Sequence, residues 1–412
     1  MARDILNRSN ESVGIDQRVW VIAEVGYGNN ASGGLFPVAT DGIEHVTAML
    51  DFKIPREDAA HRSGRSLVTR LSKKKEVKWS FESYIVPADP TGLNPNLPDM
   101  HPMLLNVFGQ VDETNAAEKV YSLTRSSAKS FRMLEEGTHF SRLAVGCVAD
   151  SVTFTLPGDG MAMVKFEGFA QDLYTSGQST LAADVVASNT LTVPTGHGKR
   201  YEVNSYIDII DQADGNTRKA ASRKVLTVVG DVLTVDGAAI NALEDDILIG
   251  AAPDFTATKS ENALLGLKGS FTTGSLGTID CQLLSAELGV KNNFTPKNFI
   301  YGTDSNCGYI ADKRREVTVK LDVLLTQDNY EFYVQNKTFV ADSVDIVLAP
   351  QEIPAPINAA AGRTFTFSFA KVEFDVPTLE QPGDSYVKLT LEGRALATDI
   401  NTVNDEFTLT IS

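Results

Sequence analysis

Two stretches of this chain carry the same pattern: Lys73–Ile85 is KKKEVKWSFESYI and Lys313–Leu325 is KRREVTVKLDVLL. Each begins with a basic cluster and Glu-Val, and continues with alternating apolar and polar residues. Alternation with a period of two is typical of a strand with one buried face. The repeat therefore predicts two related β units in one chain, with Glu76 equivalent to Glu316.

A second pair of matches follows in the same order along the chain. Val152–Pro157 (VTFTLP) is matched by Val372–Pro377 (VEFDVP), and a Gly-Asp turn follows each of them. The segment after each turn contains Val-Lys and an apolar residue, beginning at Val164 and at Val387. A duplicated β domain usually serves architecture and assembly, so this order favours a structural protein.

Length and composition limit the class of protein. The chain has 412 residues, of which 42% are hydrophobic and 22% are charged. This length exceeds one ordinary core and predicts two or three domains. Met1–Val13 has no apolar stretch long enough for a signal peptide, and no segment approaches the roughly 20 apolar residues of a membrane helix. We therefore expect synthesis and folding in a cytoplasm.

The formal net charge is −16, and it is spread along the chain. A field of that sign repels phosphate, which disfavours a protein that grips DNA through its backbone. The same sign suits a surface past which nucleic acid slides, and it equally suits simple solubility.

The apolar alternation changes phase near the end of the chain. Phe365, Phe367 and Phe369 share one face, and the apolar positions then shift to Val372 and Phe374. A strand cannot exchange its faces without an extra residue, so a bulge is predicted at Ala370-Lys371. Helical patterns are few: 101–110 and 328–337 each predict a short helix.

Residues 178–258 separate the two copies and have a rhythm of their own. Short strands are predicted at 188–194, 201–203, 206–210, 224–229 and 232–235, with turns between them. This spacing is typical of a small β barrel. The predicted organisation is a mainly β chain, with a first β domain at 1–177, an inserted barrel at 178–258 and a second β domain at 259–412.

The first copy contains a proline-rich loop, Pro87–Pro102 (PADPTGLNPNLPDMHP), which the second copy lacks. Its prolines cannot join a sheet interior, and so long a loop in a compact domain is often functional. An interaction role and a solvated excursion both fit. As an interaction loop it would present Asn94, Pro95, Leu97, Asp99 and Met100 to a neighbouring molecule.

Patterns that carry chemistry are absent from the sequence. The five histidines have no metal-ligand spacing, and no nucleophile, phosphate-binding or dinucleotide motif occurs. Asp208, Asp211 and Asp214 resemble a calcium loop only faintly, and their spacing favours a hairpin tip. Three widely spaced cysteines, Cys147, Cys281 and Cys307, disfavour zinc and a disulfide framework. No enzymatic activity, metal or cofactor is predicted.

Several of these stretches are similar to bacteriophage tail tube (major tail) proteins. The similarity lies in Gly64-Arg65-Ser66, Lys75–Pro87, Pro102–Gly109 and the hairpin Val152–Gly168. It covers most of residues 40–177 and, more weakly, 280–400. The resemblance implies tube domains, each a β-sandwich or barrel with one short helix. Six such domains form a ring whose inner strands join into one barrel, and rings stack through loops and arms.

The resemblance also implies a location and partners. The protein would lie in the virion tail, made in the host bacterial cytoplasm, and serve genome ejection through a long non-contractile tail. Two tube domains per chain imply a trimeric, pseudo-hexameric ring with the inserted barrel projecting outward. The implied partners are further copies, the terminator, tape measure and tail-tip proteins, and double-stranded DNA that passes through an acidic channel without specific binding. No membrane partner is implied. The proline loop would contact the next ring.

Two other functions fit parts of the pattern. A tail-tip or baseplate ring protein would carry the same tube domain. A surface carbohydrate-binding β-sandwich would need exposed aromatic platforms, whereas Trp20 and Trp79 both lie in strand patterns typical of a core. An enzyme on a β scaffold would need a convergent group of His, Asp and Glu, which the sequence pattern does not supply.

Overall fold

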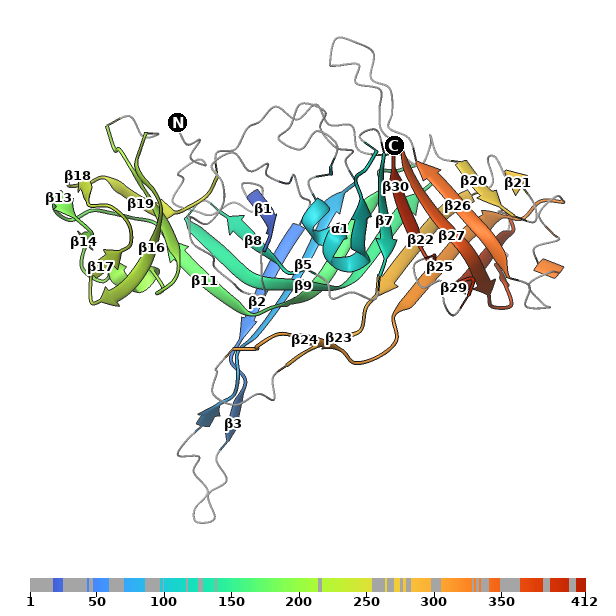
Figure 1. Ribbon diagram of the computed structural model, residues 1–412, viewed down its shortest axis with the longest axis horizontal. Helices are drawn as coiled ribbons and strands as arrows, with labels where there is room; N and C mark the ends of the chain where they lie inside the picture. Colours follow the sequence, from blue (N-terminus) through green and yellow to red (C-terminus); the bar gives the residue numbers. More distant parts are fainter. Residues whose placement is uncertain are drawn as a thin grey trace, which may run out of the picture.

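The computed structural model describes a mainly β protein (Figure 1). The described residues are 18–24, 43, 47–58, 70–85, 97–98, 100–115, 118–124, 129–137, 139–213, 217–253, 264, 270–274, 277–278, 283–297, 305–327, 330, 333–334, 341–348, 364–380, 386–399 and 405–412. No helix among them is long and apolar enough to cross a membrane. The helix α1 (His101–Phe108) forms where the sequence predicts it and ends at Gly109, whose φ is 87°.

A central antiparallel sheet begins with four neighbouring strands. Their order across the sheet is β2 (Thr47–Lys53), β5 (Glu76–Tyr84), β10 (Met163–Ala170) and β9 (Phe140–Pro157). The predicted alternation holds in β5, where Val77, Trp79 and Phe81 are buried and the residues between them are not. One face of this part of the sheet therefore meets the core, and the other is polar.

Four later strands repeat this arrangement. Their order is β22 (Leu283–Lys291), β25 (Glu316–Leu324), β29 (Lys388–Ala395) and β27 (Phe365–Phe374), with the short β28 (Thr378–Glu380) continuing the outer edge. β9 pairs with β22, so the two runs are hydrogen-bonded into one continuous sheet. We call the β9–β22 contact the internal joint.

The register of the two runs is also repeated. Glu76 lies opposite Lys53 and Glu316 lies opposite Lys291, so the first sequence match is structurally equivalent. Gly168 and Gly393 take equivalent places, opposite Trp79 and Val319. At both glycines the neighbouring strand approaches closely, since an added Cβ would lie 2.0 Å from Val148 O and 2.7 Å from Glu373 O respectively.

The second sequence match is wrong by five residues. Val152 lies opposite Phe166, whereas Val372 lies opposite Ala395, which is not the equivalent of Phe166. The sequence match pairs Thr153 with Glu373, whereas the register makes Thr378 the equivalent of Thr153. Both segments alternate with the same period, so pattern alone cannot distinguish one register from another shifted along the strand.

Both runs contain a register shift at the same place. In β10 the shift falls between Glu167 and Gly168. In the second run it falls between Thr390, which lies opposite Thr378, and Gly393, which lies opposite Phe374. The bulge predicted at Ala370-Lys371 is confirmed as well, because β27 advances three residues there while its neighbour advances two.

The same hydrogen-bonded sheet continues past the central strands and curls over their apolar face. We call this covering part, together with α1, the second layer. Its strands include β1 (Arg18–Ala23), β8 (Phe131–Glu136), β6 (Gly109–Asp112), β7 (Lys119–Leu123), β30 (Thr408–Ile411), β26 (Asp342–Leu348) and β20 (Ser270–Thr273). Residues of both runs belong to one continuous core. Phe407 packs within this core. Its ring is stacked on that of Phe369, with 4.5 Å between the ring centroids, and lies near the rings of Phe108 and Phe154.

Smaller elements complete the part outside the insert. β11 (Asp172–Gly177) extends the pairing of β9, and β21 (Gly277–Thr278) pairs with β20. β23 (Phe294–Pro296) pairs with β24 (Tyr309–Ala311). β3 (Arg56–Asp58) and β4 (Arg70–Ser72) pair with each other and project away from the sheet beyond β2 (Figure 1).

The insert folds around a core of its own. Its elements are β12 (Ser179–Thr180), β13 (Val185–Ser188), β14 (Thr190–Thr192), η2 (His197–Arg200), β15 (Tyr206–Ile210), β16 (Arg218–Val229), β17 (Val232–Val235), β18 (Ile240–Ala242) and β19 (Ile247–Gly250). Six of these strands form one sheet, separate from the central sheet. The strand predicted at 201–203 is instead a bridge and turn.

The insert rests on the outer side of the second layer. In β1, Val19 and Val21 face the main core, while Trp20 points the other way. Trp20 joins Leu134 and Leu143 in an apolar contact with Tyr206, Ala251 and Ala252. The second layer therefore lies between the central sheet and the insert. Figure 1 shows the insert at one end of the long axis.

Candidate assembly interface

The internal joint shows how two edges of this sheet fit together. Seven residues of β22, from Ser285 to Lys291, lie opposite Pro157 to Ser151 of β9. The apolar residues of the joint on its core side are Val152, Phe154, Leu156, Ala286, Leu288 and Val290, each at most 3% exposed. A backbone ladder and a row of buried apolar side chains thus hold the joint together.

The two ends of the eight-strand run are edges. Among the described residues, β2 pairs with β5 on one side only, and β28 pairs with β29 on one side only. An edge strand exposes unpaired N–H and C=O groups that can pair with another chain. These two edges are therefore the places where the central sheet can grow.

The two edges correspond to the two sides of the internal joint. β2 has the register of β22, so Leu50 is equivalent to Leu288 and Phe52 to Val290. β28 has the register of the outer part of β9, so Leu379 is equivalent to Phe154. An edge of the β22 type and an edge of the β9 type thus lie at opposite ends of one chain.

Exposure distinguishes the edges from the joint. Phe52 is 38% exposed, whereas its equivalent Val290 is 1% exposed. Leu379 is 36% exposed, whereas its equivalent Phe154 is fully buried. Met49, on the polar side of β2, is 62% exposed. Apolar side chains at both edges therefore lack the cover that the internal joint gives to their equivalents.

The residues predicted from the proline loop are placed only in part. Asn94, Pro95 and Asp99 lie outside the described residues. Leu97 is half-buried, and Met100 is 2% exposed because it packs in the core at the start of α1. Neither edge strand is predicted from the sequence motifs above. The sequence signal for β2 is the apolar content of 48–54 (AMLDFKI), where Phe52 and Ile54 share a face with Leu50.

A pocket of about 900 Å³ lies where the insert meets β11, and it contains a Ser–His contact. Ser179 Oγ is 2.8 Å from His197 Nδ1, and Arg200 is 3.0 Å from His197 Nε2. A guanidinium can only donate, so Nε2 accepts and Nδ1 carries the proton. His197 therefore donates to Ser179 and cannot take its proton, so this contact does not activate a nucleophile.

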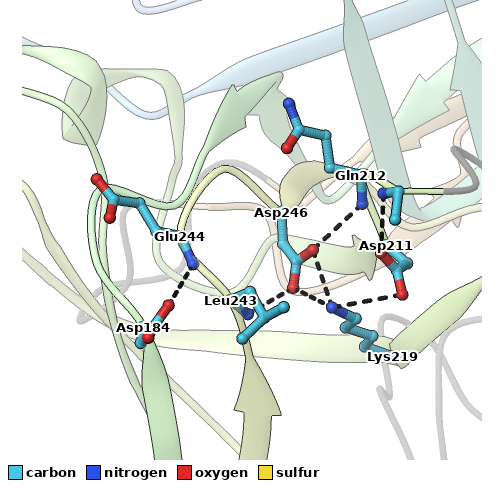
Figure 2. A network of polar contacts seen from close by, with 8 residues as sticks. Asp184, Asp211, Gln212, Lys219, Leu243, Glu244 and Asp246 are labelled. Carbon is cyan, nitrogen blue, oxygen red and sulfur yellow. Dashed lines mark hydrogen bonds and ion pairs between the residues drawn. The ribbon is translucent and has the colours of Figure 1, made fainter.

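Carboxylates of the insert gather around a lysine (Figure 2). Lys219 Nζ lies 2.8 Å from Asp246 and 3.5 Å from Asp211, and the backbone N–H groups of Gln212 and Leu243 donate to Asp246. The ammonium group occupies the position that a cation would need. Within the described ranges no group of three His, Cys, Asp or Glu residues is placed to hold a metal ion.

The remaining residues singled out in the sequence are structural where described. Asp208 pairs with Arg218 at 3.0 Å, while Asp214 lies outside the described residues. Burial raises the pKa of the Cys147 thiol, and Cys307 is exposed. Trp20 and Trp79 are both buried, so neither forms an exposed platform for a sugar. Cys281 lies outside the described residues.

Comparison of the sequence with protein-family models and with curated proteins found no match. The features that bear on the class of protein are therefore the central sheet and its two edges.

Proposed function

We propose that this chain is a structural protein of a phage tail, which assembles into rings that stack into the tail tube. The observation that carries the proposal is the internal joint together with its two counterparts, β2 and β28, each of which pairs on one side only within the part of the chain that the structure describes. Each chain contains one complete joint and half of another at each end. A second copy supplies the missing half.

The register of the internal joint specifies the contact between copies. It places Leu50 of one chain opposite Leu379 of the next, and Phe52 opposite Pro377. This contact is head-to-tail, and such contacts close into rings when the rotation between neighbours allows it. Closure would pair every edge of the central sheet, which removes the hazard of an exposed edge strand.

The number of strands bears on the size of the ring. Each chain contributes eight strands to the run from β2 to β27. In three chains, about 24 strands spaced about 4.8 Å apart and tilted by roughly 40° enclose a barrel about 45–50 Å across between backbones. Two chains would give only about 32 Å by the same reasoning, which side chains would narrow further. Three chains leave room for a DNA duplex.

The insert and the projecting hairpin suit the outside and the ends of such a ring. The insert lies beyond the second layer, on the side away from the polar face of the central sheet. Paired β3 and β4 project from the end of β2, next to the proposed joint. We propose that this hairpin and the proline loop contact neighbouring rings, and that the insert decorates the tube. The tape measure, terminator and tail-tip proteins would be its other partners.

A cysteine cross-link tests the proposed contact. The register places Asp51 opposite Thr378 of the next chain, as Gly289 lies opposite Thr153 within one chain. The double variant Asp51→Cys/Thr378→Cys, in a background with Cys281→Ser and Cys307→Ser, is oxidised and run on a denaturing gel. We expect a series of bands that ends at three chains.

The matched control is Asp51→Cys/Val376→Cys, which moves one cysteine two residues along the same face. It should cross-link far less. Bands that end at six chains would contradict the trimeric ring. Equal cross-linking in both variants, or monomer alone in both, would contradict the proposed contact.

A further inference from the structure

The polar face of the central sheet carries charges of both signs. Its cations are Lys53, Lys78, Lys165, Lys291, Lys320, Lys371, Lys388 and Arg394. Its carboxylates include Asp51, Glu76, Glu82, Asp150, Glu167, Glu287, Glu316, Asp322, Glu373 and Glu392. Cations and carboxylates are therefore interspersed over this face, although the chain as a whole has a net charge of −16.

The charges of this face are arranged in opposite pairs across neighbouring strands. The directly opposed pairs are Lys53–Glu76, Lys78–Asp51, Lys165–Glu82, Lys291–Glu316, Lys320–Glu287, Lys320–Glu392, Arg394–Glu373 and Lys388–Glu380. None of the directly opposed pairs of charged residues in these strands has like charges.

Several side chains of this face are in direct contact. Lys320 lies 2.8 Å from Glu392, Lys165 lies 2.5 Å from Glu167, and Lys388 lies 2.9 Å from Asp322. Hydrogen bonds to Glu392 and to Glu167 raise the pKa values of Lys320 and Lys165 respectively. These lysines therefore stay charged, but each charge already has a carboxylate beside it.

We infer that this face lines the channel of the tube and lets double-stranded DNA pass because its cations are neutralised in pairs. The inference rests on the proposed function. When the sheet closes, one face must point inward. The apolar face is covered by the second layer and, beyond it, by the insert, so the polar face is the one left to line the channel.

Paired charges suit a passage better than either sign alone. Unpaired lysines bind phosphates and release counterions, which makes retention of DNA strong at low salt. A strongly acidic lining would repel DNA at the entrance. A lysine that is already paired must leave its carboxylate before it can bind a phosphate, so the face neither holds nor repels the duplex.

Removing carboxylates tests the inference. The triple variant Glu287→Gln/Glu316→Gln/Glu392→Gln removes the partners opposite Lys320 and Lys291 and makes the face more positive by three charges. All three side chains are exposed, so folding should be preserved. The control Glu202→Gln/Glu244→Gln/Asp245→Asn makes the same charge change at exposed sites of the insert. The assembled proteins are mixed with a short fluorescent DNA duplex, and the bound fraction is measured by sedimentation.

We expect the wild-type protein and the insert control to retain no DNA at 50 or 200 mM salt. The channel-face variant should retain DNA, with an affinity that falls about twelve-fold between these concentrations if two lysines bind phosphates. Salt-dependent retention by wild-type rings, or a channel-face variant that behaves like the insert control, would overturn the inference. Electron microscopy of the same samples separates this outcome from failure of the proposed function, which an absence of rings would show.

Discussion

Phe52 offers the sharpest test of the energy of the proposed joint. Its side chain is 38% exposed at the edge of β2, and its equivalent in the internal joint is buried. A phenylalanine has on the order of 200 Å² to bury, so closing the joint would cover about 75 Å² more. At about 25 cal/mol per Å², that burial stabilises each joint by about 2 kcal/mol.

The substitution Phe52→Ala should therefore weaken each joint by about 30-fold, since 1.4 kcal/mol corresponds to a factor of ten. We expect the protein concentration at which rings form, measured by sedimentation velocity, to rise by at least that factor. Val186→Ala, at a 78% exposed site on the insert, serves as the control and should leave ring formation unchanged. An unchanged threshold for Phe52→Ala would refute the reasoning.

Three further predictions concern the single chain. Gly168→Val should destabilise the central sheet severely, because an added Cβ would lie 2.0 Å from Val148 O, and thermal denaturation would show this as a large fall in melting temperature or as insoluble protein. Lys219→Met leaves the buried Asp246 without its ion pair and should lower the free energy of unfolding of the insert by about 3–5 kcal/mol. Chemical denaturation measures this change, and an unchanged transition would contradict the role given to the pair. Burial acts to raise the pKa of Asp322, but hydrogen bonds from Lys388, Thr390 and Ser285 outweigh it and lower the pKa. The carboxylate therefore stabilises the fold above its unfolded pKa of about 3.9 and loses this effect as the pH falls through the lower folded value, so Asp322→Asn should lower the melting temperature more at pH 7 than at pH 3.

The strands themselves could be predicted from the sequence. Alternation in the two Glu-Val stretches identified β5 and β25, and the change of phase after Phe369 identified the bulge at Ala370-Lys371. Both signals are local, because the alternation of buried and exposed side chains is set by neighbouring residues of a single strand. The prediction of a separate insert rests on a similar signal, because its short strands and frequent turns differ from the long strands around it.

The register and the edges could not be predicted. The sequence pattern matches Val152 to Val372 because both begin alternating segments, and a slip along such a segment leaves its pattern intact. The residue that fixes the register is Gly168, whose equivalent Gly393 is identifiable only from the neighbouring strand. The sequence pattern places Met100 in the proline loop, whereas the structure places it in the core at the start of α1. The sequence does not show where the loop rejoins the core.

In the proposed ring, β2 of one chain pairs with β28 of the next in the register of the internal joint. Cryo-electron microscopy of the assembled protein would resolve this contact. We expect a ring of three chains in which Leu50 lies opposite Leu379 of the neighbouring chain, with the insert outside. A ring in which β2 faces solvent, or a ring in which β2 pairs in another register, would contradict it.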